Sequence, residues 1–428
     1  MGEVHERPKL VQFGAGNIGR SFIGQIFSRS GWEVVFVDVD RRLVSLLNER
    51  RCYTVAIKRE GKPDEFRRVG PVRAVDGGDP AAVAAELAAA DMAATSVGKS
   101  ALPKILPLIA GGLAERRRLS GDRPLDIIIA ENDREAPGLF RSVLQSGLGP
   151  EYPLDTLVGL VETSIGKMVP IMKAADTAAD PLMLFAEEYE TLILDKRGFQ
   201  GLPFAGLRDE GAGPGGLSVS AIHPVDPIAA YVDRKLFVHN LGHAAAAYLG
   251  VQKTSGAAVT TIPEALALPG IEAGVRRAMN EAADALVLEY PGKRYPGSYS
   301  REDLSAHIED LLFRFKNRAL GDTVYRVGRD LGRKLAREDR LTGAMLLCAK
   351  YGLPFGGIAE VYRAALSFAV PAEDGALFLA DREFRRRYGL EEAVSAEKAL
   401  PVLREVSLLD DSRPADGAVM NTVLQGRF

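Results

Sequence analysis

The first half of the chain alternates short apolar runs with helical patterns. The runs at residues 9–13, 33–38, 92–96 and 126–130 are short, buried in character and bounded by turn residues. Between the first two, residues 17–30 show helical spacing of apolar positions. Strand and helix in turn predict an α/β fold of the Rossmann type, a doubly wound parallel sheet.

The pattern changes between residues 52 and 75, where charged residues interrupt β-type runs and no helical period is present. This segment predicts an inserted antiparallel ribbon. Further on, β-like pieces at 157–161 and 192–194 are expected to extend the sheet. The stretch 206–216, GLRDEGAGPGG, is rich in glycine and proline and predicts a linker between domains.

Beyond the linker, apolar positions recur mainly at helical spacing, so residues 217–391 are predicted to form a second, mainly α-helical domain. Residues 392–428 are charged and less periodic, which predicts one helix and a loose tail. The first domain then covers residues 1–205. Two domains fit the length, since 428 residues exceed the size at which a single core stops growing.

Composition narrows the class of protein. The 54 basic and 57 acidic residues give a net charge of -3, which provides no basic field for nucleic acid or an anionic membrane. Two cysteines cannot build a disulfide framework and fit a reducing compartment. The N-terminal sequence MGEVHERPKL lacks the apolar region of a secretory signal, and no apolar run has the length of a membrane helix. A cytoplasmic protein with a small-molecule substrate is expected, as a monomer or homodimer.

A glycine-rich motif follows the first predicted strand. In GAGNIGR, Gly14, Gly16 and Gly19 fill the pattern G-x-G-x-x-G. The first glycine permits a tight turn, the second lets the backbone approach a pyrophosphate, and the third lets the helix pack on the strand. The loop residues expected to line a dinucleotide are Phe13, Gly14, Ala15, Gly16, Asn17, Ile18 and Gly19.

The second predicted strand ends in Asp38, 19 residues after Gly19. A carboxylate at this place can accept hydrogen bonds from the adenosine ribose and would repel a 2′-phosphate. NAD is therefore the expected cofactor, although Arg41 and Arg42 could serve a 2′-phosphate.

Two other strand ends are candidates for the cofactor site. Thr95 and Val97 lie in the turn after the predicted strand 92–96, and Asn132 follows strand 126–130. Ligands of such sheets bind at the carboxyl ends of the strands. A purely structural loop at these places is an even alternative.

The segment RKLFVHNLGHAAAAYLG at residues 234–250 carries a second candidate site. At about 100° per residue, Lys235, His239, His243 and Asn240 share one side of a helix. If a nicotinamide is bound nearby, Lys235 can act as a base once a desolvated pocket lowers its pKa. Asn240 can donate to a developing alkoxide, and His243 can orient a substrate hydroxyl.

The same segment permits two other interpretations, a zinc site and a solvated helix face. His239 and His243 have the i, i+4 spacing of helical zinc ligands, but the glutamate of the H-E-x-x-H motif is absent. No metal is expected. The four polar residues could also form a solvated helix face, an alternative that the apolar run AAAAYLG weakens.

These residues together resemble the polyol-specific long-chain dehydrogenases, the mannitol dehydrogenase family. The resemblance rests on GAGNIGR with Asp38, on Glu131-Asn132, and above all on K-x4-N-x2-H from Lys235 to His243. It covers about residues 9 to 390. It implies a metal-independent NAD-dependent oxidoreductase with Lys235 as general acid/base, Asn240 and Asn132 as donors to the carbonyl, and His243 orienting substrate.

Gly242-His243 is similar to the phosphate-accepting members of that family, which implies interconversion of D-mannitol 1-phosphate and D-fructose 6-phosphate. A substrate phosphate needs cations, and Lys167, Arg326 and Arg333 are the candidates. Lys167 stands where the family usually has an Asp-Arg pair. Three alternatives stay open: a sibling oxidoreductase for an unphosphorylated polyol or a hexuronate, a β-hydroxyacid dehydrogenase, and a dinucleotide-binding protein without turnover.

Overall fold

The chain forms two compact units, Met1–Ala229 and Ala230–Phe428. The computed structural model describes residues 7–170, 172, 176–201, 219–254, 259–291, 299–373 and 375–427. The predicted linker at 206–216 lies outside the described residues. The division between the units comes after that linker, within the first turn of helix α8 (Ile228–Arg234).

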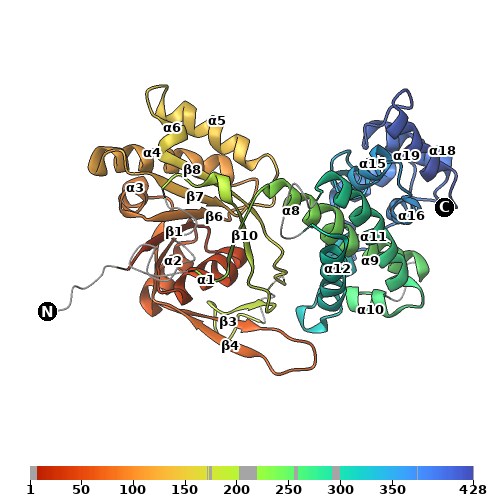
Figure 1. Cartoon of the computed structure of the whole chain (residues 1–428). Helices are drawn as coiled ribbons and strands as arrows, with labels where there is room; N and C mark the ends of the chain where they lie inside the picture. Colours follow the sequence, from red (N-terminus) through yellow and green to blue (C-terminus); the bar gives the residue numbers. More distant parts are fainter. Residues whose placement is uncertain are drawn as a thin grey trace. The chain divides into compact units, whose positions relative to one another are not determined.

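The first unit is built on an eight-stranded sheet with the order β11-β10-β8-β7-β6-β1-β2-β5 (Figure 1). Its strands are β1 (Lys9–Phe13), β2 (Glu33–Asp38), β5 (Val72–Asp76), β6 (Met92–Thr95), β7 (Leu125–Ile129), β8 (Val158–Ser164), β10 (Leu192–Asp195) and β11 (Ile222–Val225). All neighbours from β5 to β8 pair in parallel. The Rossmann-type fold is thereby confirmed.

One edge of the sheet departs from the all-parallel prediction. Strand β10 runs antiparallel to β8, and β11 then pairs in parallel with β10. A parallel pair needs a long crossover, usually a helix. The described residues between β8 and β10 contain only the short strand β9 (Leu184–Ala186), so the chain returns in the opposite direction.

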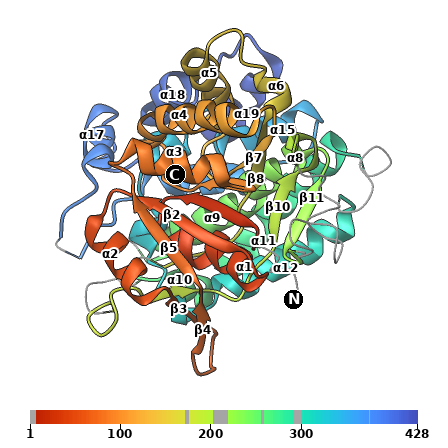
Figure 2. The same cartoon turned by 90° about the vertical axis from the view of Figure 1, so that its left-hand side faces the viewer.

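Helices cover both faces of this sheet (Figure 2). They are the π-helix η1 (Gly19–Gly24), α1 (Gln25–Arg29), α2 (Arg41–Arg50), α3 (Pro80–Ala89), α4 (Leu102–Ser120), α5 (Ala136–Leu148) and α6 (Leu154–Leu157), with the 3-10 turn η2 (Lys196–Gly198). Alternate residues of a strand point to opposite faces. Leu10 and Val34 therefore enter the core beneath η1, α1 and α2, while Val11 and Phe13 enter the core beneath α3, α4 and α5.

The predicted ribbon at 52–75 is partly different. Strands β3 (Tyr53–Ile57) and β4 (Glu65–Val69) form the expected antiparallel pair, and β9 joins β3 in a three-stranded sheet. The end of the predicted segment is instead β5, a strand of the main sheet that pairs with β2. Its charged residues are explained by position, because β5 is the edge strand and Arg73 forms ion pairs with Glu33 and Glu86.

The second unit is helical, as predicted. Its elements are α8, the π-helix η4 (Lys235–Asn240), α9 (Leu241–Lys253), α10 (Ile262–Ala267), α11 (Ile271–Glu289), α12 (Arg301–Phe315), the 3-10 turn η5 (Arg318–Leu320), α13 (Val324–Gly328), α14 (Leu331–Lys334), α15 (Thr342–Lys350), α16 (Gly356–Leu366), α17 (Leu379–Arg387), α18 (Ala396–Glu405) and α19 (Pro414–Leu424). Helix α9 is central and contacts α10, α11, α13 and α16. A Cβ at Gly242 would overlap Met279 of α11, so glycine permits this close approach.

One helix and a loose tail were expected at the end of the chain. Helix α18 is the expected helix, but the predicted tail forms a second helix, α19. Helix α19 packs on α15 and α16 and buries Val419 and Val423. Arg337 donates two hydrogen bonds, of 2.8 and 2.9 Å, to the buried carboxylate of Asp416. Residues 392–427 are therefore part of the second unit.

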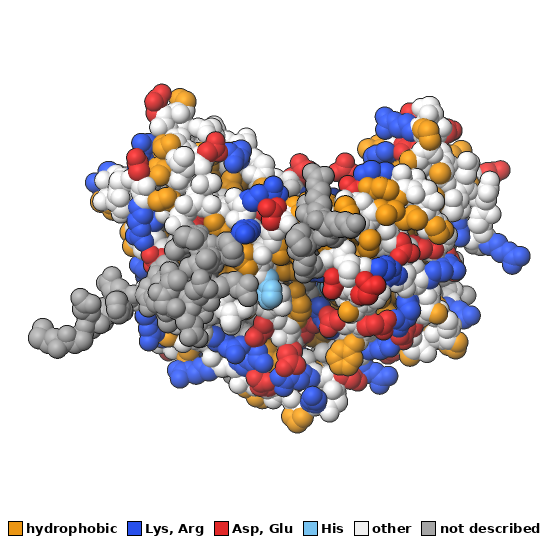
Figure 3. All heavy atoms as spheres, in the orientation of Figure 1, with side chains coloured by type: hydrophobic (Ala, Val, Ile, Leu, Met, Phe, Trp, Pro, Cys, Tyr) orange, Lys and Arg blue, Asp and Glu red, His pale blue; other side chains and the backbone are white. Residues whose placement is uncertain are grey.

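Surface charge agrees with the composition. On the face shown in Figure 3, acidic and basic side chains are interspersed over each unit. Within the described ranges, no helix is both long enough and apolar enough to cross a membrane.

Candidate active site

The glycine loop joins β1 to η1 and is shaped by close backbone contacts. Gly14 has a φ of +88°, and its N–H donates to the carbonyl of Val37 at 2.9 Å. A Cβ at Gly14 would lie 2.7 Å from the carbonyl oxygen of Ser96, and one at Gly19 would collide with the Gly14 carbonyl. Both positions therefore require glycine to close the turn.

Gly16 is different from the other two glycines of the motif. A Cβ at this position would meet no atom within 4 Å, and its φ is not in the left-handed region. Nothing in the protein itself therefore requires glycine here. The open space fits the approach of a pyrophosphate to the backbone, the role expected of the second glycine.

Asp38 lies beside this loop at the end of β2. Its Oδ2 accepts a hydrogen bond of 2.7 Å from the Ala15 N–H, and its Oδ1 accepts one of 2.9 Å from the Asp40 N–H. Two backbone donors thus hold the carboxylate in one orientation. The remaining lone pairs can accept from the hydroxyls of a ribose, so the loop and Asp38 together fit an NAD molecule.

The turn after β6 is tied to the turn after β7. The carboxylate of Glu131 accepts from Val97 N–H at 2.9 Å and from Gly98 N–H at 2.8 Å. Thr95 is buried at the end of β6, and Asn132 is exposed. The structure therefore brings Thr95, Val97 and Asn132 to the same edge of the sheet as the glycine loop.

Two residues of the first unit have roles that the sequence did not predict. Lys167 is only 7 % exposed, and its Nζ donates to the carbonyl of Tyr189 at 2.8 Å, so it is a buried residue of this unit. Gln12, which the sequence did not single out, donates from Nε2 to Phe13 O at 2.6 Å and to Ser96 Oγ at 2.9 Å. Gln12 thus braces the glycine loop against the turn after β6.

In the second unit, the predicted catalytic segment begins as the π-helix η4, which runs from Lys235 to Asn240, and not as a regular α-helix. A π-turn inserts an extra residue in each turn and is frequent at functional sites. His239 and His243 nevertheless share a side, as expected, because both rings pack on Phe315 and their centroids lie 6.3 Å apart. His239 is buried at this place, 5.5 Å from Phe315 between ring centroids.

Lys235 has an unusual protonation equilibrium. Burial of the ammonium group, with a smaller contribution from the nearby Arg340, lowers the pKa of Lys235 from its ordinary 10.5 to about 8. Burial also lowers the pKa of His239 well below its usual value, and the positive charge of Arg314 acts in the same direction. His239 is therefore a neutral group at physiological pH.

His243, on the first turn of α9, is held by two neighbours. Its ring stacks on Phe315 with 4.7 Å between centroids, and its Nε2 lies 2.7 Å from Oδ2 of Asp322. Burial alone would raise the pKa of Asp322, but His243 and Arg326 lower it to about 2. Asp322 is therefore a carboxylate that fixes the imidazole orientation. Asn240 is half-buried, and its amide has no partner within the part of the chain that is described.

The predicted phosphate cations are engaged by carboxylates. Arg326 Nε donates to Asp322 at 2.8 Å, so this arginine is adjacent to His243 through their shared partner. Arg333 pairs with Asp330 at 2.5 Å and with Asp339 at 3.3 Å. Arg326 thus shares its partner Asp322 with His243 of the lysine segment, residues 234–250.

Comparison with known proteins decides the family. A model of the mannitol dehydrogenase Rossmann domain matches residues 8–203, and a model of the mannitol dehydrogenase C-terminal domain matches residues 227–415. The chain belongs to the mannitol dehydrogenase family. The oxidoreductase class, the Rossmann-type fold and the NAD cofactor expected from the sequence are those of this family.

The relatives give the relationship in more detail. The chain is 33% identical over 366 residues to a mannitol-1-phosphate 5-dehydrogenase from Brevibacillus brevis, covering 85% of this chain and 86% of that one. The solved mannitol 2-dehydrogenase of Pseudomonas fluorescens, in complex with NAD and D-mannitol, superposes with a TM-score of 0.70 at 16% identity. That match covers 97% of this chain and 91% of that chain. A ketopantoate reductase from Ralstonia eutropha is more distant, with a TM-score of 0.46 at 16% identity, covering 83% of this chain and 97% of that one.

Two acidic residues of this mannitol dehydrogenase family member were not assigned roles from the sequence. Glu131 belongs to the Glu131-Asn132 pair that supports the resemblance, but no role follows for it from the sequence, and Asp322 belongs to none of the motifs. Asp322 stands four residues before Arg326, a spacing that permits a helical ion pair and could have drawn attention to it. Nothing in the sequence indicates that it also contacts His243.

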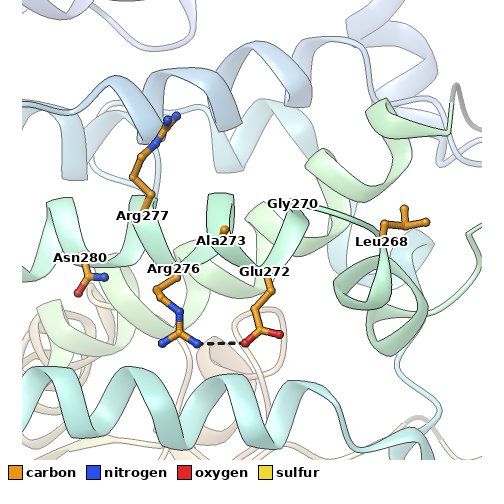
Figure 4. Close-up of a pocket in the computed structure, with 7 residues that line it drawn as sticks. All are labelled: Leu268, Gly270, Glu272, Ala273, Arg276, Arg277 and Asn280. Atoms are coloured by element: carbon orange, nitrogen blue, oxygen red, sulfur yellow. Dashed lines mark hydrogen bonds and ion pairs between the residues drawn. The ribbon is translucent and has the colours of Figure 1, made fainter.

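A surface hollow of about 560 Å³ on α11 lies apart from these residues (Figure 4). Its arginines are already paired, Arg276 with Glu272 and Glu309, and Arg277 with Glu360. None of the predicted site residues lines it. Among the described residues, no group of three or more His, Cys, Asp or Glu side chains is placed to hold a metal ion.

Proposed function

We propose that this protein is a hexitol-phosphate dehydrogenase that interconverts D-mannitol 1-phosphate and D-fructose 6-phosphate with NAD. The observation that carries this proposal is the 33% identity to a mannitol-1-phosphate 5-dehydrogenase over 85% of the chain. A reaction of this kind needs a base for the hydroxyl proton, a donor for the developing alkoxide, and a group that orients the substrate.

Lys235 is the proposed general acid/base. With a pKa lowered to about 8, a useful fraction of the side chain is neutral at physiological pH, and the group can still return the proton in the reverse reaction. During oxidation, the substrate hydroxyl transfers its proton to Nζ of Lys235 while the C–H bond breaks. Bound NAD supplies the acceptor for the hydride that leaves that carbon.

Asn240 and His243 are proposed to position the reacting oxygen and a neighbouring hydroxyl. The amide of Asn240 can donate to the alkoxide as charge develops on it. Nε2 of His243 lies 2.7 Å from Oδ2 of Asp322, so Nδ1 is the ring nitrogen proposed to contact a substrate hydroxyl. Asn132 of the first unit is a further proposed donor.

The cations predicted to bind the substrate phosphate all have partners within the protein. Both Arg326 and Arg333 are paired with carboxylates, and Lys167 donates to a backbone carbonyl. This observation favours a second candidate, a dehydrogenase for an unphosphorylated polyol. Of the three cations, Arg326 remains the best placed, because its partner Asp322 also contacts His243.

The two candidates are separated by comparing fructose 6-phosphate, fructose and tagaturonate as substrates for reduction by NADH. The hexitol-phosphate proposal expects kcat/KM to be highest with fructose 6-phosphate. Activity with fructose but not with its 6-phosphate would contradict it. The variant Arg326→Gln should raise KM for the phosphorylated substrate more than for fructose, and equal changes would remove Arg326 as a phosphate ligand.

A further inference from the structure

A buried arginine lies directly behind the glycine loop. Arg20 follows Gly19 and is only 7 % exposed. Its Nε donates to the carbonyl of Ala15 at 2.6 Å, and an Nη donates to the carbonyl of Leu182 at 2.9 Å. The guanidinium carbon also lies 5.9 Å from the centroid of the Tyr53 ring. The side chain therefore reaches back from η1 to the middle of the motif GAG.

The charge of Arg20 has no close counter-ion. Among the residues described, no carboxylate lies within ion-pair distance of the guanidinium, and its hydrogen bonds are to neutral carbonyls. Burial lowers the pKa of Arg20, and Asp38 and Asp180 offset this only from a distance. Charged side chains are almost never fully buried without a partner, because desolvation is costly. The described protein groups therefore leave this positive charge without a close negative partner, at a place beside the open side of the glycine loop.

A second buried arginine in the same unit shows what a purely structural role looks like. Arg116 is 2 % exposed, and all three of its side-chain nitrogens donate to carbonyls, among them those of Ala90, Arg123 and Pro124. It closes the end of α4 against neighbouring loops. Arg20 makes fewer such bonds and instead adjoins the Ala15–Gly16 peptide, where the structure leaves open space for a ligand.

We propose that Arg20 is an electrostatic determinant of cofactor binding, whose buried positive charge strengthens binding of the NAD pyrophosphate at the glycine loop. The two negative charges of a pyrophosphate provide the compensation that the described protein groups lack. In a site shielded from water, such a charge acts over a longer distance than it would on the surface. Through its bond to Ala15, Arg20 also positions the loop that faces the phosphates. This inference depends on the dinucleotide site of the family and not on the substrate or the lysine proposed above.

The test compares Arg20→Gln, which removes the charge but keeps an amide donor, with Arg20→Lys, which keeps the charge. Dissociation constants are measured for NADH, ADP and adenosine. NADH and ADP both carry a pyrophosphate, whereas adenosine carries no phosphate and reports on the nucleoside part of the site alone. We expect Arg20→Gln to weaken NADH and ADP binding by about tenfold or more, with adenosine changed by less than about twofold. Arg20→Lys should stay within about threefold of the native protein for all three ligands.

Arg116→Gln is the matched control, because it also removes a buried guanidinium. It should lower the melting temperature without changing the ratio of ADP to adenosine affinity. The proposal is overturned if Arg20→Gln binds ADP as the native protein does, or if adenosine loses as much affinity as ADP, since that result indicates distortion of the loop. If Arg20→Gln does not fold, Arg20→Lys decides: a tenfold loss in the ADP to adenosine ratio despite the retained charge contradicts the electrostatic role.

Discussion

The glycine loop of the first unit and the lysine segment of the second unit are built on opposite principles. The loop is defined by backbone atoms and by the absence of side chains, as the contacts of Gly14 and Gly19 show. The lysine segment depends on side chains whose protonation is set by burial, as with Lys235 and His239. Changes of shape should therefore damage the loop itself, where the one charge proposed to act is that of the buried Arg20, and changes of charge should damage the lysine segment.

The largest effect is expected for Lys235→Met, which keeps the bulk of the side chain and removes the amine. General acid/base groups contribute about 10² to 10⁴ in rate, so kcat should fall by about 10³. Binding of NADH should change little, because the glycine loop does not include this residue. The matched control is Lys253→Met, at the exposed end of α9. A Lys235→Met enzyme with more than about a tenth of native kcat would contradict the general acid/base role.

The pH dependence of kcat/KM should reflect the lowered pKa of Lys235. Oxidation of the alcohol needs neutral Lys235, so kcat/KM in that direction should fall by about tenfold per pH unit below a pKa of about 8. Reduction needs the protonated lysine and should decline above that value. Arg340→Gln removes a nearby positive charge and should move the limb to higher pH. If the pH at which kcat/KM begins to fall is unchanged in this variant, burial alone would account for the lowered pKa of Lys235.

The steric character of the loop is tested by a pair of alanine substitutions. Gly16→Ala adds a Cβ that meets nothing in the protein, so the melting temperature should stay within about 2 °C while the NADH dissociation constant rises by about tenfold. Gly19→Ala places a Cβ against the Gly14 carbonyl and should destabilise the fold itself by more than about 2 kcal/mol. Equal stability losses in the two variants would mean that Gly16 is structural as well.

A smaller effect is expected from Asp322→Asn, which keeps the shape and removes the negative charge beside His243. The imidazole then loses the partner that fixes its orientation, and outer partners of this kind are typically worth about tenfold to a hundredfold in activity. We expect KM for the sugar substrate to rise while NADH affinity is unchanged. Loss of NADH affinity in this variant would indicate general disruption of the second unit rather than a local effect.

The sequence predicted the loop better than the lysine segment for a physical reason. Strands β1 and β2 have the predicted bounds because apolar runs between turn residues leave few alternatives, and the glycine spacing follows from local sterics. A π-helix leaves no comparable signature, so the sequence predicted a regular α-helix where the π-helix η4 (Lys235–Asn240) lies. The ion pair of Asp322 with Arg326 and its contact with His243 depend on tertiary packing.

The C-terminal helices illustrate a different kind of miss. Signals for them were present in the sequence, since Ser395 caps α18 by accepting from the Lys398 N–H, and Pro414 occupies the first turn of α19. The high charge of the region outweighed these signals in the prediction of a loose tail. Charge on an amphipathic helix occupies the exposed face and does not argue against helix formation.

The smallest effect is expected for Arg41→Gln. This variant tests whether an exposed charge near the loop contributes to NADH binding, as the buried charge of Arg20 is proposed to do. Arg41 is paired with Asp76 at 2.8 Å, but its side chain is 83% exposed, so the pair is screened by solvent. The dissociation constant for NADH should change by less than about twofold, and the preference over NADPH should not fall, because Asp38 still repels a 2′-phosphate. Asp38→Asn is the positive control, in which that preference should decrease. If Arg41→Gln weakened NADH binding by tenfold, exposed charge as well as backbone shape would define the cofactor half of the molecule, and the contrast between the two regions would fail.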